Sequence, residues 1–194
     1  MQKVNADFVK GKKVLLRYDI DVALGKVTGN RLQVTEDYKL KAGLDTLKLC
    51  LENASKVIII GHLGRPFATT EDEKGGNPAE LSAKPIQKWF EKELGQTIGF
   101  AEGLEEVEGL EEKVVLLENI RFFHGEVPGA DYHATCTSKT CDIDFAKKLA
   151  SLGEVYVNEA FSAYRPSVST TILPTLLPHG AGLHFAEEVN ILTE

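Results

Sequence analysis

The chain has 194 residues, of which 43% are hydrophobic and 26% charged, and its formal net charge is −7. This balance is typical of a globular domain and argues against non-specific binding to nucleic acid or to an anionic membrane. No apolar run approaches the ~20 residues of a membrane span and no signal peptide is present, so we expect a soluble, cytoplasmic protein.

Four short apolar runs predict the strands of a sheet. They are residues 14–16, 57–60, 114–117 and 155–157. Each run is continuous and rich in β-branched residues instead of alternating with polar ones. That pattern is typical of parallel strands that are buried on both faces.

Helical stripes of apolar residues lie between these runs. The first stripe belongs to a helix that begins near Thr35, and consists of Leu40, Leu44, Leu47 and Leu51. The second consists of Ala83, Ile86, Phe90 and Leu94, and the third of Phe145, Leu149 and Leu152. Asp142 or Asp144 would cap the third helix, which would end at Gly153. Alternating strands and helices predict one α/β domain: a doubly wound, Rossmann-like fold with a mostly parallel sheet flanked by helices.

The three cysteines are an odd number, which argues against a disulfide framework. Cys50 falls in an apolar helical pattern and is interpreted as a small core residue. Cys136 and Cys141 lie near His133, so a metal site or a Cys136–Cys141 disulfide is conceivable. The spacing matches no strong zinc motif, and the sequence favours a plain exposed loop.

Arginines follow all four predicted strands. They are Arg17, Arg65, Arg121 and Arg165, and the fifth arginine is Arg31. Open α/β sheets bind ligands at the carboxyl ends of their strands, so these four side chains should meet there together with His62. A guanidinium binds phosphate or carboxylate bidentately. One such arginine could be an ordinary surface charge, but four together predict a site for a small, highly anionic ligand.

The same loops resemble the phosphoglycerate kinase family. Residues 62–66 match its HLGRP motif, and residues 117–122 match the end of its LLEN-aliphatic-RF segment. Residues 149–161 are similar to the stretch leading into VNDAF, residues 17–22 to RVDFNVP, and residues 181–189 to AAGFLMEKEL. The match runs in order from about Lys13 to the last residue. Neither a P-loop nor a dinucleotide-binding glycine motif occurs in the chain.

The resemblance implies a glycolytic kinase that transfers a phosphoryl group between 1,3-bisphosphoglycerate and ADP. Arg65, Arg121 and Arg165 would hold the phosphate of 3-phosphoglycerate, with His62 and Asp19 beside the glycerate. The full implied substrate-binding set is Arg17, Asp19, Asp21, Lys39, His62, Leu63, Gly64, Arg65, Arg121 and Arg165. Lys39 is also the implied catalytic residue, because it falls where the family has an arginine that bridges the substrate carboxylate and the migrating phosphoryl group.

Several positions depart from the family pattern. Asp21 replaces an asparagine and places an extra carboxylate beside an anionic substrate unless it pairs or is protonated. Lys39 keeps the charge of the family arginine but loses its bidentate fork, and Arg31 is an alternative source of that group. Ser167 falls where a histidine is usual.

The resemblance covers only the first half of the family's proteins. Residues 1–185 would form the N-terminal phosphoglycerate-binding domain and residues 186–194 the truncated start of the interdomain helix. Mg-ATP or Mg-ADP would bind to the missing C-terminal domain, with no cofactor or metal on this chain. Expected partners are 3-phosphoglycerate and that domain; the chain should be monomeric and inactive alone. Two alternatives are a stand-alone binding or regulatory module derived from this domain, and a generic Rossmann-like domain for another phosphorylated acid.

Overall fold

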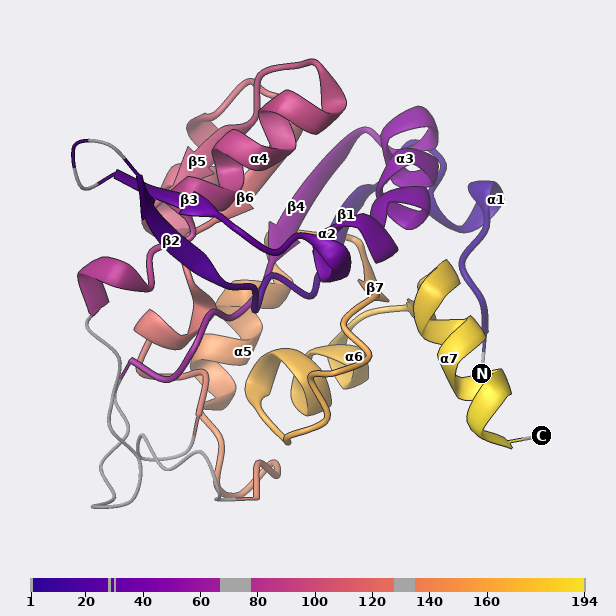
Figure 1. Cartoon of the computed structure of the whole chain (residues 1–194). Helices are drawn as coiled ribbons and strands as arrows, with labels where there is room; N and C mark the ends of the chain where they lie inside the picture. Colours follow the sequence, from indigo (N-terminus) through magenta and orange to yellow (C-terminus); the bar gives the residue numbers. More distant parts are fainter. Residues whose placement is uncertain (1, 28, 30, 67–77, 128–134, 194) are drawn as a thin grey trace.

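A six-stranded parallel sheet forms the centre of the molecule (Figure 1). The computed structural model describes residues 2–27, 29, 31–66, 78–127 and 135–193. The strands are β5 (Gly99–Ala101), β6 (Val114–Leu117), β4 (Lys56–Ile60), β1 (Lys13–Arg17), β7 (Val155–Asn158) and β8 (His179–Ala181), in that spatial order. The four predicted strands are confirmed and occupy the middle of the sheet, whereas the two edge strands were not predicted.

Helices cover both faces of this sheet, which confirms the predicted α/β class. The helices α3 (Leu44–Asn53) and α4 (Lys84–Leu94) lie on one face, and α5 (Ile143–Ala150) and α6 (Leu173–Leu176) on the other. The shorter elements are α1 (Ala6–Val9), α2 (Tyr38–Ala42), 3-10 turns at Pro78–Glu80, Leu104–Gly109 and Ile120–Phe122, and a π-helical turn at Val168–Ile172. The last helix is α7 (Leu183–Thr193). None of the described helices has the length and apolar character needed to cross a membrane.

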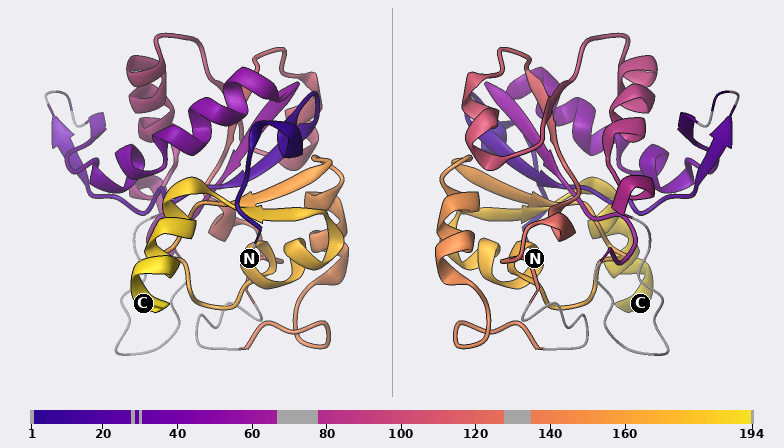
Figure 2. Two further views of the ribbon diagram at one scale, coloured as in Figure 1. Left: turned by 90° about the vertical axis from the view of Figure 1, so that its right-hand side faces the viewer. Right: turned by 90° about the vertical axis from the view of Figure 1, so that its left-hand side faces the viewer.

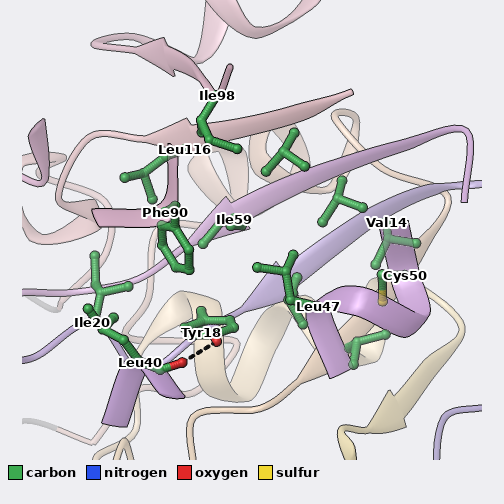
Figure 3. Packing of buried hydrophobic residues seen from close by; sticks show 14 of the residues in the cluster. Val14, Tyr18, Ile20, Leu40, Leu47, Cys50, Ile59, Phe90, Ile98 and Leu116 are labelled. Atoms are coloured by element: carbon green, nitrogen blue, oxygen red, sulfur yellow. Dashed lines mark hydrogen bonds between the residues drawn. The ribbon is translucent and has the colours of Figure 1, made fainter. Parts of the chain in front are cut away.

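The apolar strands bury side chains on both faces, as their sequence pattern predicts. Leu16 and Ile59 point toward α3 and α4 in a first core, whereas Leu15 and Ile58 point toward α5 and α6 in a second core on the other face. In the first core, the ring of Tyr18 meets Phe90 edge to face at 5.3 Å, and its hydroxyl donates to the carbonyl of Leu40 (Figure 3). Burying these apolar surfaces is the main stabilising contribution to the fold.

The helix predicted to begin near Thr35 is two helices. The first, α2, begins at Tyr38, and Gly43 separates it from α3. A Cβ atom at Gly43 would lie 2.5 Å from Cζ of Tyr18, so only glycine permits this close approach to the ring. The break therefore comes from a tertiary contact that the leucine stripe does not reveal.

A two-stranded antiparallel hairpin projects from the body of the molecule (Figure 2). Its strands are β2 (Leu24–Val27) and β3 (Arg31–Val34), and Leu24 and Val34 pack against the first core. Lys26 on the hairpin forms an ion pair with Glu80 at 2.8 Å. Residues 69–77, a polar and glycine-containing stretch that the sequence pattern predicts to be an insertion, lie outside the described residues.

Cys136 and Cys141 form a disulfide, which corrects the prediction of a plain exposed loop. The intervening turn brings their Cα atoms to 5.2 Å, with the amide of Cys141 donating to the carbonyl of Thr137. Cys136 is also buried against the second core. His133, the third member of the conceivable metal site, lies outside the described residues. Cys50 is fully buried, as predicted, and burial raises the pKa of its thiol to about 12.

The C-terminal helix α7 starts at Leu183, three residues before the predicted start of the interdomain helix. Its first amides are held by a side chain after β7: Glu159 accepts hydrogen bonds from the amides of His184 (3.1 Å) and Phe185 (3.4 Å). The amide of Leu183 donates to Thr46 on α3. The beginning of α7 is thus fixed to α3 and to the segment that follows β7.

Candidate functional site

The loops after β1, β4, β6 and β7 surround a cavity of about 320 Å³ at the carboxyl edge of the sheet. Among the residues that the structure describes, five cationic side chains and two carboxylates line it. The cations are Arg17, Lys39, Arg65, Arg121 and Arg165, and the carboxylates are Asp21 and Glu126. The structure therefore brings together the four arginines that the strand pattern placed at one edge. An excess of positive charge in a concave site favours a small polyanion.

Arg17 lines the cavity although it is only 1% exposed. Its Nε donates to the hydroxyl of Ser169 (3.1 Å), and its Nη1 donates to the carbonyl of Tyr18 (2.9 Å). Its Nη2 lies 2.6 Å from Nδ1 of His62. These contacts fix the guanidinium rigidly, so Arg17 contributes charge and orders its neighbours.

His62 is held in a single protonation state by this contact. A guanidinium can only donate, so Nδ1 of His62 must accept and the imidazole proton must reside on Nε2. Burial, reinforced by the charge of Arg17, lowers the pKa of His62 well below its usual value. The ring is therefore neutral at pH 7, with the Nε2–H group 3.7 Å from a carboxylate oxygen of Asp21.

Asp21 pairs with the backbone of the next loop. Its Oδ1 accepts a hydrogen bond from the amide of Gly64 at 2.9 Å. Gly64 has a positive φ of 56°, a conformation that glycine adopts without strain, and its carbonyl accepts from Nη1 of Arg121 at 2.7 Å. The extra carboxylate that departs from the family pattern thus has a structural partner in this chain.

Asn119 joins the loops that carry Arg65 and Arg121. Its side chain is fully buried; Oδ1 accepts from the amides of Leu63 and Arg121, and Nδ2 donates to the carbonyls of Leu63 and Leu81. All the hydrogen-bonding atoms of this amide are therefore used. A buried, fully bonded amide of this kind fixes the separation of the two loops.

Lys39 enters the cavity from α2, on the side next to Asp19. Its Nζ lies 3.3 Å from the hydroxyl of Ser162 and 3.5 Å from Oδ1 of Asp19. Ser162 in turn donates to Oδ2 of Asp19. This cluster separates the main cavity from a second one of about 290 Å³ beside α7. Asp19, Lys39 and Ser162 all line the second cavity.

Two of the predicted site residues do not line the main cavity. The side chain of Leu63 is buried in the first core, because its backbone is bonded to Asn119. Asp19 faces Ser162 and the second cavity. Arg31 begins β3 on the separate hairpin and is not among the residues that line either cavity. The other predicted residues, including Lys39, do line the main cavity.

Several residues of the site were not predicted from the sequence. Glu126, Ser162 and Thr170 line the cavity, and Asn119 and Ser169 lie directly behind it. Ser167 is buried and bonded to Glu126 where the family usually has a histidine. No periodic pattern marks these residues, since most of them act through contacts between loops distant in the sequence.

Comparisons with known proteins identify the family. The protein-family model for phosphoglycerate kinase matches residues 4–194. The chain belongs to the phosphoglycerate kinase family. It is 35% identical over 190 residues to the phosphoglycerate kinase of Dictyoglomus turgidum, covering 95% of this chain and 42% of that protein. It is 36% identical over 193 residues to the cytosolic phosphoglycerate kinase of Triticum aestivum, again covering 95% of this chain and 42% of the relative.

Solved phosphoglycerate kinase structures share the fold. The enzyme from Pyrococcus horikoshii OT3 superposes with a TM-score of 0.75 at 24% identity, over 100% of this chain and 45% of that one. The enzyme from Coxiella burnetii gives 0.70 at 25% identity, over 95% and 42%. The chain thus spans less than half the length of the phosphoglycerate kinases it matches. Its parallel sheet with helices on both faces is the fold of the matching part.

Proposed function

We propose that this chain is the 3-phosphoglycerate-binding part of a phosphoglycerate kinase. The observation that carries the proposal is the convergence of Arg65, Arg121 and Arg165 with His62 around one cavity. These residues come from three separate loops, in a chain whose family is named for this substrate. In this assignment the three arginines bind the phosphate and His62 lies beside the glycerate, whereas Asp19, which does not line the main cavity, acts through Lys39 and Ser162.

The same arrangement suits phosphoryl transfer between 1,3-bisphosphoglycerate and ADP. Such transfers need positioning and charge neutralisation more than covalent chemistry. Guanidinium groups held at strand ends supply both, since they do not have to reorganise during the reaction. Lys39 is assigned to the migrating phosphoryl group because it lines the cavity with a cationic head.

The nucleotide is assigned to a part of the protein beyond this chain. The family implies nucleotide substrates, and in this proposal Mg-ATP or Mg-ADP binds to a C-terminal domain that follows α7. Residues 1–185 are then the acceptor-binding domain, and the end of α7 leads into the connection. We assign the complete protein to glycolysis in the cytoplasm as a monomer; a cytosolic enzyme is among its relatives.

Calorimetry with the 194-residue chain tests the assignment. Titration with 3-phosphoglycerate should give saturable binding, whereas glycerate, which lacks the phosphate, should bind far more weakly. Mg-ATP should not bind, and the chain alone should give no turnover. Equal affinity for glycerate and 3-phosphoglycerate would contradict the arginine assignment, and turnover by the isolated chain would contradict the division between two domains.

A further inference from the structure

Glu126 is an unexpected residue in a site for an anion. Its side chain is 1% exposed, yet it lines the cationic cavity together with the arginines. A carboxylate there repels a bound phosphate, and burial raises its pKa, while the charge of Arg17 opposes that rise. Charge alone therefore gives no reason for an acidic residue at this position.

The contacts of Glu126 supply a different reason. Its Oε1 accepts from the hydroxyls of Ser167 (2.7 Å) and Ser169 (2.6 Å). Its Oε2 accepts from the amide of Ser169 (3.1 Å), and its own carbonyl accepts from the amide of Val168 (3.0 Å). One residue thus binds three consecutive positions that lie more than forty residues away in the sequence.

From Ser167 the network reaches the arginine on one wall of the cavity. The amide of Ser167 donates to the hydroxyl of Thr170 (2.9 Å), and that hydroxyl donates to the carbonyl of Arg165 (3.0 Å). The backbone that presents Arg165 is therefore tied to the segment that Glu126 holds. A shift of this segment would move the guanidinium away from a bound phosphate.

From Ser169 the network reaches Arg17 and His62, which also line the cavity. The hydroxyl of Ser169 has one proton, which it donates to Glu126, so it can accept from Nε of Arg17. Arg17 then donates to Nδ1 of His62 and sets which imidazole nitrogen carries the proton. The orientation and tautomer of His62 thus depend on a carboxylate that does not touch it.

We propose that Glu126 is a positioning residue that fixes two residues lining the cavity, His62 through Ser169 and Arg17, and Arg165 through Ser167 and Thr170. The proposal rests on the proposed function, because it takes the cavity to be the phosphoglycerate site. A buried network in which each member is bonded holds one arrangement of its loops. Because Glu126 holds His62 and Arg165 in place, this contribution to ligand binding offsets the repulsion between its negative charge and the ligand.

The variant Glu126→Gln distinguishes a charge effect from a positioning effect, because the two predict opposite changes in the affinity for 3-phosphoglycerate. Removing a negative charge beside an anion should tighten binding of 3-phosphoglycerate if charge alone matters. Glutamine, however, has one acceptor oxygen where glutamate has two, so its nitrogen replaces the acceptor either of the Ser169 amide or of the two serine hydroxyls, and the network is broken in either orientation. We expect affinity to fall roughly tenfold, the loss of about one charge-assisted hydrogen bond. The matched control is Glu159→Gln, which alters an equally buried carboxylate outside the main cavity and should leave affinity unchanged.

Nitrogen-15 NMR of the His62 ring provides a readout that loss of stability alone would not change. In the ligand-free parent chain, the ring should be the neutral tautomer protonated on Nε2. Glu126→Gln and Ser169→Ala should both produce a mixture of tautomers, and Glu159→Gln should not. Thermal denaturation of each variant establishes that it is folded at the temperature of the NMR and binding measurements.

The outcomes separate this inference from the proposed function. If the parent chain does not bind 3-phosphoglycerate, the proposed function fails, and the His62 tautomers still decide whether Glu126 positions that ring. If the parent binds and Glu126→Gln binds as tightly or more tightly, with an unchanged His62 tautomer, the positioning role is overturned. Should Glu126→Gln fail to fold, Ser169→Ala decides the matter, because an unaltered His62 tautomer in that variant would refute the pathway through Arg17.

Discussion

The two edges of the central sheet carry basic residues that have different partners. At the amino edge, Nζ of Lys56 donates to the carbonyls of Val107 (3.1 Å) and Leu110 (2.5 Å), and Nζ of Lys12 donates to the carbonyl of Phe8 (2.9 Å). A shallow cavity at that edge mixes lysines with glutamates; its charged residues are Lys48, Glu52, Glu93 and Lys113. At the carboxyl edge, cations outnumber carboxylates among the described residues that line the main cavity.

This difference shows that the kind and grouping of the cations matter more than net charge. The ammonium groups of Lys12 and Lys56 satisfy carbonyls of nearby turns, which is a structural use of positive charge. The arginines of the other edge come from separate loops and are held around one space by Asn119 and by the Glu126 network. A protein with a net charge of −7 can therefore contain an anion site, because the local field is set by a few converging groups.

The largest expected effect is a loss of stability when the hydrogen bonds that join the loops at the carboxyl edge are removed. Asn119→Ala removes four hydrogen bonds from buried backbone groups and should lower the free energy of unfolding by about 3 kcal/mol. The control at the other edge is Asn53→Ala, whose side chain makes one hydrogen bond, to the carbonyl of Leu49. That change should cost about 0.5–1 kcal/mol. Urea denaturation measures both, and equal losses would mean that Asn119 does not hold the loops together.

The next effect concerns ligand affinity. Replacing Arg65, Arg121 or Arg165 by Ala should weaken binding of 3-phosphoglycerate by about 1.5–3 kcal/mol, or roughly 10- to 150-fold. The loss should diminish as added salt screens the site. Lys113→Ala at the amino edge should leave affinity almost unchanged. Calorimetry over a range of salt concentrations tests this, and similar losses at the two edges would place the anion site elsewhere.

A smaller effect distinguishes the two glutamates that flank β7. Glu154 is exposed at the amino edge and accepts from the amide of Lys13, whereas Glu159 is buried beneath α7. Burial raises the pKa of Glu159 to about 7, and the amides of α7 oppose the rise only partly. The folded state thus holds a proton that the unfolded state releases near pH 4.5. The stability due to this group is complete below pH 4.5 and is lost as the pH rises through about 7.

Comparing the parent chain with the Glu159→Gln variant separates the contribution of Glu159 to stability from that of other titratable groups. Stability of the parent should fall relative to Glu159→Gln between pH 5 and pH 8, by on the order of 2 kcal/mol. Glu154→Gln, the control at the other end of the strand, should follow the parent over the same range. Thermal denaturation at several pH values gives the comparison. Parallel curves for the parent and Glu159→Gln would show that Glu159 does not titrate in this range.

The sequence predicts the inner strands and the arginines for the same physical reason. Runs such as residues 57–60 are buried on both faces, and a residue that follows such a run must lie at the carboxyl edge. The edge strands β5 and β8 have three residues each and contain glycine, so they give no comparable signal. The break at Gly43 and the bond between Cys136 and Cys141 depend on contacts and turn geometry that composition does not encode.

The supporting residues of the site were beyond prediction for a related reason. Glu126 follows a glycine in a long loop, and its bonds to Ser167 and Ser169 span 41 and 43 residues. A hydrogen bond across such a separation has no period in the sequence. Motif resemblance therefore finds groups that face a ligand, whereas the groups that hold them in place emerge only from the fold.

The smallest expected effect concerns Lys39, the one lysine among the cations that the described part of the chain places around the main cavity. In a protein that joins this chain to its nucleotide-binding part, Lys39→Arg should raise kcat a few-fold and leave affinity for 3-phosphoglycerate nearly unchanged. The reason is that a guanidinium fork can bind two oxygens of the migrating group, whereas an ammonium is a mobile point charge. A contact that strengthens in the transition state changes kcat.

Two further variants make the Lys39 result specific. Arg31→Ala should leave kcat unchanged, because Arg31 begins β3 on the hairpin and does not line the main cavity. Lys113→Arg makes the same chemical change at the amino edge and should also have no effect. Steady-state kinetics of the three variants with saturating nucleotide decides between the two basic residues. A kcat that falls on loss of Arg31 and does not respond to Lys39→Arg would mean that the hairpin, and not α2, supplies the cation to the phosphoryl group.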